Sequence, residues 1–210
     1  MSTDDPDRRE LLQTLASMAL AGAAPAASAA AAPPEPVPFH PTEAPEAGPA
    51  MLRPPMRQRS PGRPGQFSFL DGHWRIRQQR LRAGLGWDGF EGEASCFSIL
   101  GGLASIEELR IPARRFSGMG LRLLDVQQSQ WSDFWVGAAS GVLVSPGQPG
   151  SFEDGAGIFE YEDQDQGRPV IYRGVWDRIT PRSCRWQQGS SHDGGRSWAL
   201  NWSMDWERVG

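Results

Sequence analysis

The stretch from residue 198 to residue 206 alternates large apolar side chains with polar ones. The apolar positions are Trp198, Leu200, Trp202, Met204 and Trp206. A period of two is typical of a β-strand with one buried face, because successive side chains of a strand point to opposite sides of the sheet. The turn signal Asp193-Gly194-Gly195 precedes this stretch, and residues 184–188 alternate in the same way. The two segments therefore predict a β-hairpin.

Proline and tryptophan divide the chain into two parts. Thirteen of the eighteen prolines lie in the first 65 residues, and all nine tryptophans follow them. A Pro-rich segment with few large apolar residues cannot bury enough surface to offset the entropy of ordering. We therefore predict a disordered N-terminal extension, ending in a Pro-rich linker over residues 33–65, and one folded domain over residues 66–210.

The first 32 residues resemble an export signal. Arg8-Arg9 precedes Leu11-Leu12, a mildly apolar stretch over 15–24 and Ala27-Ser28-Ala29, which has the form of a cleavage site. The arginine pair is similar to a twin-arginine motif and predicts a periplasmic or secreted protein. A disordered Ala-rich tail or a short amphipathic helix is the alternative. No run reaches the roughly 18 apolar residues of a membrane-spanning helix, so we expect no stable membrane span after cleavage.

Charge and lysine content exclude several classes of function. After Gln66 the chain has fifteen Arg against eighteen Asp and Glu, and no basic run longer than Arg114-Arg115. Nucleic acid is therefore not an expected partner, since phosphate binding needs a concentrated basic surface. All twenty-one basic residues are arginine. Enzymes with a lysine Schiff base and proteins with a P-loop are excluded as well, because both need a lysine.

The predicted domain consists of short alternating runs separated by glycine and turn residues, with no long helical period. Ten such runs predict an all-β fold, a single antiparallel up-and-down barrel of roughly eight to ten strands. Closure of the barrel would remove the exposed sheet edges. The predicted strands span 72–81, 89–99, 104–111, 120–125, 130–138, 150–153, 156–161, 170–178, 184–190 and 196–208.

Several motifs of the domain resemble known families. The run Phe69-Leu70-Asp71-Gly72-His73-Trp74 resembles the Gly-x-Trp opening of lipocalin-like (calycin) barrels, in which the Trp closes one end and a late basic residue, here Arg208, packs across it. A wider set resembles the bacterial DUF1579 family, which is assigned to the calycin-like barrels. That set comprises Ile99-Leu100-Gly101-Gly102, Glu107-Glu108, Gly120-Leu121-Arg122, Trp131, Phe134-Trp135, Gly167-Arg168-Pro169, Arg185-Trp186-Gln187 and Asp193-Gly194-Gly195-Arg196-Ser197-Trp198. The resemblance covers nearly all of residues 66–209 and implies the fold, but no settled activity.

Alternation predicts which side chains point into this barrel. If Trp74 points inward, then Ile76, Gln78 and Arg80 do so too, and the pairing of Trp74 with Arg208 places all the apolar side chains of the 198–206 stretch inside, with the polar ones between them in water. The resulting lining is both aromatic and polar, which suits a bound molecule better than a dry core. The candidate ligand-binding residues are Trp74, Arg80, Tyr172, Trp176, Trp186, Gln188, Trp198, Trp202 and Arg208.

Candidates for catalysis are few. Glu107, Glu108 and Asp133 are the carboxylates to consider, and only one of the adjacent pair Glu107 and Glu108 can face inward. The inward one is either a general acid or base with a raised pKa or the ion-pair partner of an inward arginine, and the ion pair is favoured. His73 and His192 have no metal-binding spacing, so we expect no metal and no cofactor.

Cys96 and Cys184 are the only cysteines. Export would expose them to oxidising conditions, where a disulfide could form, but buried free thiols are favoured, because the two predicted strands are far apart in sequence.

Three functions remain open. The first, which we favour, is an exported barrel that binds a small apolar or aromatic molecule, with Arg80 meeting an anionic group. The second is an enzyme, a cyclase, isomerase or hydrolase, acting on a hydrophobic metabolite through one of the carboxylates. The third is a structural or interaction module with a filled core, which an apolar patch on the outer surface would mark. The sequence does not indicate the oligomeric state.

Overall fold

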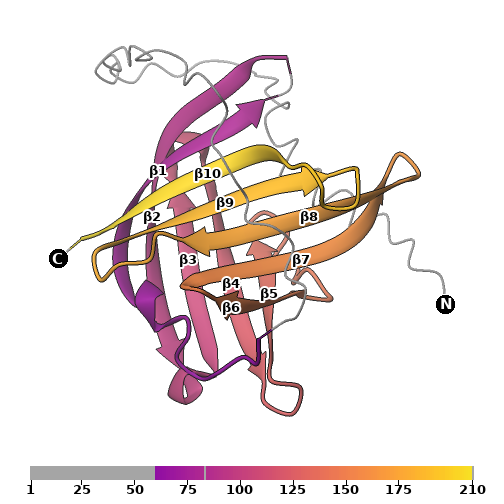
Figure 1. Ribbon diagram of the computed structural model, residues 1–210. Helices are drawn as coiled ribbons and strands as arrows, with labels where there is room; N and C mark the ends of the chain where they lie inside the picture. The colour runs from indigo at the N-terminus through magenta and orange to yellow at the C-terminus, as the bar shows by residue number, and fades with distance from the viewer. Residues whose placement is uncertain (1–59, 83, 210) are drawn as a thin grey trace, which may run out of the picture. The chain divides into compact units, whose positions relative to one another are not determined.

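The computed structural model describes residues 60–82 and 84–209, and these form a closed antiparallel barrel of ten strands (Figure 1). Each strand pairs with its neighbours in sequence, and β1 pairs with β10 to close the barrel. The predicted export signal and nearly all of the predicted linker lie outside the described residues. The strands are β1 (Gly72–Arg82), β2 (Gly86–Ile99), β3 (Ala104–Ile111), β4 (Phe116–Asp125), β5 (Gln130–Gly137), β6 (Gln148–Glu153), β7 (Ala156–Asp165), β8 (Arg168–Asp177), β9 (Ser183–Ser191) and β10 (Ala199–Arg208).

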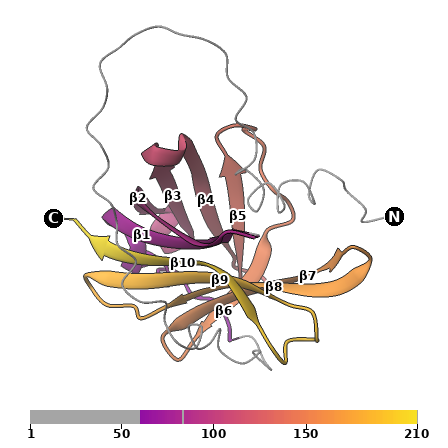
Figure 2. The same ribbon diagram turned by 90° about the horizontal axis from the view of Figure 1, so that it is seen from above.

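All ten predicted strands are present, which confirms the fold class. Three strands begin several residues from their predicted starts: β2 at Gly86 rather than at Gly89, β4 at Phe116 rather than at Gly120, and β10 at Ala199 rather than at Arg196. Strands β7 and β8 are longer than predicted, and their hairpin extends beyond the body of the barrel (Figure 2). These ends depend on which neighbouring backbone is available for pairing, a property that the alternation of one strand does not contain.

The alternation of β1 agrees with its burial. Trp74, Ile76 and Gln78 are buried, whereas Arg75 and Arg77 between them are exposed. The register brings Trp206 opposite Ile76 and Trp202 opposite Arg80, so the inward faces of β1 and β10 meet. The predicted inward direction of Trp202, Met204 and Trp206 is confirmed by their burial.

A β-bulge overturns part of the prediction for β10. The register shifts between Leu200 and Trp202, so Leu200 pairs with the outward Gly189 and Trp202 with the inward Gln188. An extra residue in one strand reverses the face of every side chain beyond it. Trp198 and Leu200 consequently pack outside the barrel, against Ile158 and Val175. Their predicted inward direction is wrong, because strict alternation assumes an unbroken strand.

One end of the barrel is closed by the segment that leads into β1. A short 3₁₀ helix, η1 (Ser68–Leu70), lies there, and the buried Phe67 packs edge-on against Trp131 at 5.0 Å between ring centroids. Gly65 also donates a 2.9 Å backbone hydrogen bond to the carbonyl of Gly102. We call this the closed end. Two further 3₁₀ turns, η2 (Leu100–Gly102) and η3 (Pro112–Arg114), connect strands.

Arg208 and Trp74 complete the closed end. The guanidinium lies 4.3 Å from the centroid of the Trp74 ring and donates to the backbone carbonyls of Phe69, Asp71 and Pro181. The Trp74 indole donates a 2.6 Å hydrogen bond to the carbonyl of Leu70. The packing of a late basic residue across the first Trp, which the calycin resemblance implies, is therefore present.

Candidate functional site

The interior of the barrel changes character from the closed end to the opposite end. Inward side chains near the closed end are buried, among them Trp74, Ile76, Trp131, Phe159, Trp176 and Trp206. Inward side chains at the other end are only half-buried, among them Arg80, Phe90, Trp135, Tyr172, Trp186 and Gln188. Solvent therefore reaches the inner face of the barrel from this side. We call it the accessible end.

Arg80 and Trp202 form the centre of the accessible end. The Arg80 guanidinium lies 4.5 Å from the centroid of the Trp202 ring, within the range of a cation–π interaction. Burial, together with the nearby Arg82 guanidinium, lowers the pKa of Arg80 to about 10, so the side chain stays charged at neutral pH. Among the described residues, no carboxylate lies within ion-pair distance of Arg80, whereas Asp88 opposite it pairs with Arg82 at 3.5 Å and with Arg114 at 2.5 Å.

The Trp202 indole is held by a buried amide. Its N–H donates a 3.1 Å hydrogen bond to the Gln78 side-chain oxygen. The Trp186 ring packs edge-on against Trp202, with 5.6 Å between the ring centroids. The arrangement gives Arg80 an aromatic surface of fixed position.

The other predicted ligand-binding residues divide between the two ends. Gln188 donates a 3.3 Å hydrogen bond to Asn201, and Tyr172 stacks on Tyr161 with 5.1 Å between ring centroids. Both residues are half-buried and lie toward the accessible end. Trp176 is buried near the closed end. Trp74 and Arg208 form the closure of this end, and within the described residues the side-chain hydrogen bonds of Arg208 all go to backbone carbonyls.

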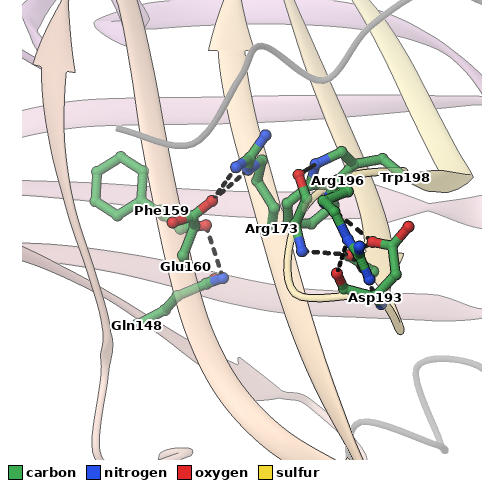
Figure 3. A network of polar contacts seen from close by, with 9 residues as sticks. Gln148, Phe159, Glu160, Arg173, Asp193, Arg196 and Trp198 are labelled. Atoms are coloured by element: carbon green, nitrogen blue, oxygen red, sulfur yellow. Dashed lines mark hydrogen bonds and ion pairs between the residues drawn. The ribbon is translucent and has the colours of Figure 1, made fainter. Parts of the chain in front are cut away.

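Trp198 belongs to a polar network on the outer face, which Figure 3 shows. The Arg173 guanidinium pairs with Glu160 and lies 3.7 Å from the centroid of the Trp198 ring. The Trp198 indole donates a 3.1 Å hydrogen bond to the carbonyl of Gly195. The Asp193 carboxylate accepts hydrogen bonds, and these lower its pKa well below the usual range. The largest contributions come from the hydroxyl and the backbone N–H of Ser197. This network orders the β9–β10 turn outside the barrel.

A buried ionic cluster lies inside the barrel. Arg122 on β4 donates a 2.5 Å hydrogen bond to Glu107 on β3, and its Nε lies 3.3 Å from Asp133 on β5. Gly120 gives the guanidinium its place, because a Cβ there would lie 3.1 Å from Nη2. Burial alone would lower the pKa of Arg122, but the Glu107 and Asp133 carboxylates outweigh it and raise that pKa. The predicted ion pair between an inward Glu and an inward Arg is present.

Asp133 differs from Glu107 in its access to solvent. Its side chain is 20 % exposed, against 4 % for Glu107. Burial raises the pKa of Asp133 to about 6, although Arg122 opposes the shift. Asp133 also marks the last pairing of β5 with β6, opposite Gln148. It is therefore a carboxyl that can exchange protons with solvent near neutral pH.

Glu108 has no place in the interior. It is exposed on the outer face and pairs with Arg110, which also bonds Glu93 at 2.9 Å. Adjacent residues of a strand face opposite sides, so the burial of Glu107 places Glu108 outside. Of the two adjacent candidates, Glu107 is therefore the inward one, and Glu108 is not placed for chemistry inside the barrel.

Arg122 is not among the predicted site residues. Gly120-Leu121-Arg122 occurs only among the motifs that resemble the DUF1579 family. The alternation of β4 together with the register between Glu107 and Gly120 places Arg122 on the inward side. The pairing of β3 with β4 cannot be inferred from the alternation within either strand, so Glu107 and Asp133 by themselves did not indicate the arginine between them.

The histidines and cysteines form no site in the described part of the chain. His73 is exposed, with Nδ1 3.1 Å from the Ser95 hydroxyl, and His192 is exposed on a turn. Cys96 and Cys184 are free and buried, and burial raises the pKa of both thiols. Over residues 60–82 and 84–209, no group of three or more His, Cys, Asp or Glu side chains is placed to hold a metal ion. No helix in the same ranges is long and apolar enough to cross a bilayer.

The outer surface carries an apolar row near the closed end. Phe97 on β2 pairs with Ile106, which pairs in turn with Leu121 and then with Phe134 on β5. Phe97 is 54 % exposed, and the other three side chains are half-buried. Such a row is the kind of feature that the third hypothesis, an interaction module, requires.

Comparisons with known proteins identify no family and no activity for this chain. No model of a known protein family matches the chain, and no curated protein matches it. Among solved structures, a protein of unknown function from the DUF3598 family of Nostoc punctiforme is 16 % identical, with a TM-score of 0.41 over 70 % of this chain. The match spans 51 % of that protein, so this chain corresponds to about half of it. Rv2717c from M. tuberculosis is 12 % identical, with a TM-score of 0.43, over 68 % of this chain and 94 % of Rv2717c.

Proposed function

We propose that the barrel binds a small apolar or aromatic molecule that carries an anionic group. The observation that supports this most is Arg80, an inward and half-buried arginine that lies on Trp202 and has no carboxylate partner among the described residues. A buried charge is costly unless it is paired, so an anion from outside the chain would stabilise it. The half-buried aromatic side chains around Arg80 would contact the apolar body of the molecule.

Two fluorescent probes test this proposal. Anilinonaphthalene sulfonate and phenylnaphthylamine share an aromatic body, but only the first is an anion. We expect both to bind, and we expect Arg80→Gln to weaken sulfonate binding by about tenfold or more, since a hydrogen bond to a charged group contributes about 1.5 to 3 kcal/mol. The affinity for the neutral amine should change little.

Arg77→Gln is the matched control. Arg77 lies on the same strand, three residues away, on the exposed outer face. This change should leave the affinity for both probes unaltered. Equal loss of sulfonate binding in the two variants would reduce Arg80 to one part of a general surface charge, and absence of binding by either probe to the folded protein would refute the proposal.

Asp133 supports a second candidate function, acid–base catalysis on a hydrophobic metabolite. The carboxyl faces the interior, is partly accessible to solvent and has its pKa raised to about 6, near the pH at which a general acid or base works best. Asp133→Asn keeps the size of the side chain and removes its acidity. Turnover of ester, lactone or enolisable ketone substrates that disappears in this variant, while the variant stays folded at neutral pH, would support catalysis.

We further propose that the protein is exported, and that its finer assignment is the DUF1579 group of calycin-like barrels. The Arg8-Arg9 pair and the Ala27-Ser28-Ala29 sequence support export. Replacing both arginines by lysine should retain the protein in the cytoplasm, which cell fractionation would detect. Recovery of this variant from the periplasm would contradict export through a twin-arginine signal.

A further inference from the structure

The buried interior near the closed end contains side-chain donors without hydrogen-bond partners. They are Nη1 of Arg122, the indole nitrogens of Trp176 and Trp206, and, farther along the barrel, the amide nitrogen of Gln78. These four residues are between 1 % and 4 % exposed. Buried polar groups are nearly always hydrogen-bonded in folded proteins, because leaving one unpaired carries its full desolvation cost.

Three of these donors belong to side chains in direct contact. The Arg122 guanidinium lies 5.3 Å from the centroid of the Trp176 ring. The centroids of Trp176 and Trp206 are also 5.3 Å apart, with the rings inclined at 64°. Trp176 and Trp206 come from β8 and β10, which both pair with β9, whereas Arg122 comes from β4, four strands away from each of them in the closed strand order. We call them the donor cluster.

The unpartnered groups are almost all of one kind. Among the inward side chains of the described residues, only one unpartnered atom can also accept a hydrogen bond. It is the hydroxyl oxygen of Ser105. The acceptor of Gln78 is already used by Trp202. An indole N–H and a guanidinium can only donate. The complementary group is therefore an oxygen acceptor.

The charges nearby decide between a neutral and an anionic acceptor. Glu107 and Asp133 together contribute two negative charges when both are ionised, against the single positive charge of Arg122. A further anion would meet a net negative cluster in a region of low dielectric, where repulsion is strong. A carbonyl oxygen accepts hydrogen bonds without adding charge.

We propose that the donor cluster binds the carbonyl oxygen of a neutral ketone, ester or amide group through the indole N–H groups of Trp176 and Trp206 and the guanidinium of Arg122. This inference rests on the proposed ligand-binding function and specifies the chemistry of the bound molecule. Arg80 lies four residues along β1 from Ile76, the partner of Trp206, which is about 13 Å at the rise of a β-strand. The molecule would thus carry its carbonyl group near the closed end and its anionic group at the accessible end.

The test uses two neutral probes of nearly equal shape, 2-acetylnaphthalene and 2-ethylnaphthalene, which differ by the carbonyl oxygen. Equilibrium dialysis should show the ketone binding about tenfold or more tightly than the hydrocarbon. Trp176→Phe and Trp206→Phe each remove one N–H while keeping an aromatic ring, and each should reduce this ratio by about fivefold. Arg122 is left unchanged, because loss of its charge would leave the buried Glu107 without a partner.

Trp131→Phe is the matched control. Trp131 is as buried as Trp176, but its N–H already donates a 2.9 Å hydrogen bond to Gln66. This variant should lose some stability and keep the full preference for the ketone. In ¹⁵N–¹H spectra, the indole signals that disappear in Trp176→Phe and Trp206→Phe should be those that shift when the ketone binds, and the Trp131 signal should not shift.

The possible failures are distinct. Equal binding of both naphthalenes would refute the donor cluster as a carbonyl site, with its N–H groups bonded to buried water instead, and would leave binding in the barrel intact. Equal loss of the ratio in Trp131→Phe would show that general packing, rather than a free N–H, gives the preference. Absence of binding by either naphthalene would overturn the inference, and it would overturn the proposed function as well only if the sulfonate and amine probes also failed to bind.

Discussion

The two ends of the barrel each contain an arginine lying on a tryptophan, and the two pairs have nearly the same geometry. Arg208 is 4.3 Å from the centroid of the Trp74 ring, and Arg80 is 4.5 Å from that of Trp202. Their hydrogen bonds differ. Arg208 donates to three backbone carbonyls, whereas no hydrogen bond of the Arg80 guanidinium occurs among the described residues. Residue type therefore does not separate the two arginines; they differ in whether their donors have hydrogen-bond partners among the described residues.

The largest expected effect concerns the buried ion pair between Glu107 and Arg122. Glu107→Gln should lower the free energy of unfolding by about 3 kcal/mol or more, because it leaves the Arg122 charge with only the more distant Asp133. The adjacent Glu108→Gln makes the same chemical change on the exposed outer face and should cost less than about 1 kcal/mol. Urea unfolding measures both, and equal losses would contradict the assignment of the two glutamates to opposite faces.

The second prediction concerns the stability that Arg208 and Arg80 each contribute. Arg208→Gln should cost about 2 to 4 kcal/mol of stability, since it leaves backbone carbonyls without their donors. Arg80→Gln should cost less than about 1 kcal/mol, because no hydrogen bond is lost and the neutral side chain is easier to bury. Thermal and urea unfolding of the two variants without ligand measure both losses of stability. A larger loss for Arg80→Gln would make that arginine structural.

The third prediction concerns Asp133, which lies between the two regions. An Asp in the unfolded chain has a pKa of about 3.9, whereas burial raises the pKa of Asp133 to about 6 in the folded protein. Between about pH 4 and pH 6 the folded protein holds a proton that the unfolded chain has released, so the free energy of unfolding falls as the pH rises. The fall from this group is at most about 3 kcal/mol.

Asp133→Asn removes this contribution. Unfolding measured at steps from pH 4 to pH 7 should show a flatter pH dependence in the variant than in the parent protein. An unchanged profile would mean that Asp133 is ionised throughout this range and is held by Arg122 alone.

The smallest expected effect lies outside the barrel. Trp198→Phe should leave phenylnaphthylamine binding unchanged within about twofold, because the ring packs on Arg173 and Ile158 at the outer face. Trp202→Phe should weaken binding, since it alters the aromatic surface inside. Fluorescence titration compares the two. Weaker binding in Trp198→Phe would extend the binding region to the outer face.

Much of the fold was predictable because alternation is a local property. The ten strands follow from period-two runs and turn residues, and the inward direction of Trp74, Gln78 and Arg80 follows from a single reference point. The error at Trp198 and Leu200 has one cause, the bulge in β10. A bulge depends on how two strands fit together and leaves no clear signal in either strand by itself.

The candidate site was predictable only in part. Arg80, Trp186 and Trp202 were selected from alternation, and the structure brings them together at the accessible end. Arg122 was missed, because its place beside Glu107 and Asp133 depends on the register of β4 with β3 and β5. Both carboxylates are eleven or more residues away from Arg122 in sequence. The contrast between Arg208 and Arg80 was likewise hidden, since both read as inward arginines near a tryptophan.

The sequence by itself determined the all-β class, the number of strands and most of the inward faces, because side-chain alternation and turn chemistry act over a few residues. Only the tertiary structure decided which end of the barrel is closed, which glutamate meets Arg122 and which indole N–H groups are left without a partner. These properties depend on contacts between residues up to 139 positions apart in sequence, as between Arg208 and Phe69. Hydrogen-bond satisfaction and burial exist only once those residues have met.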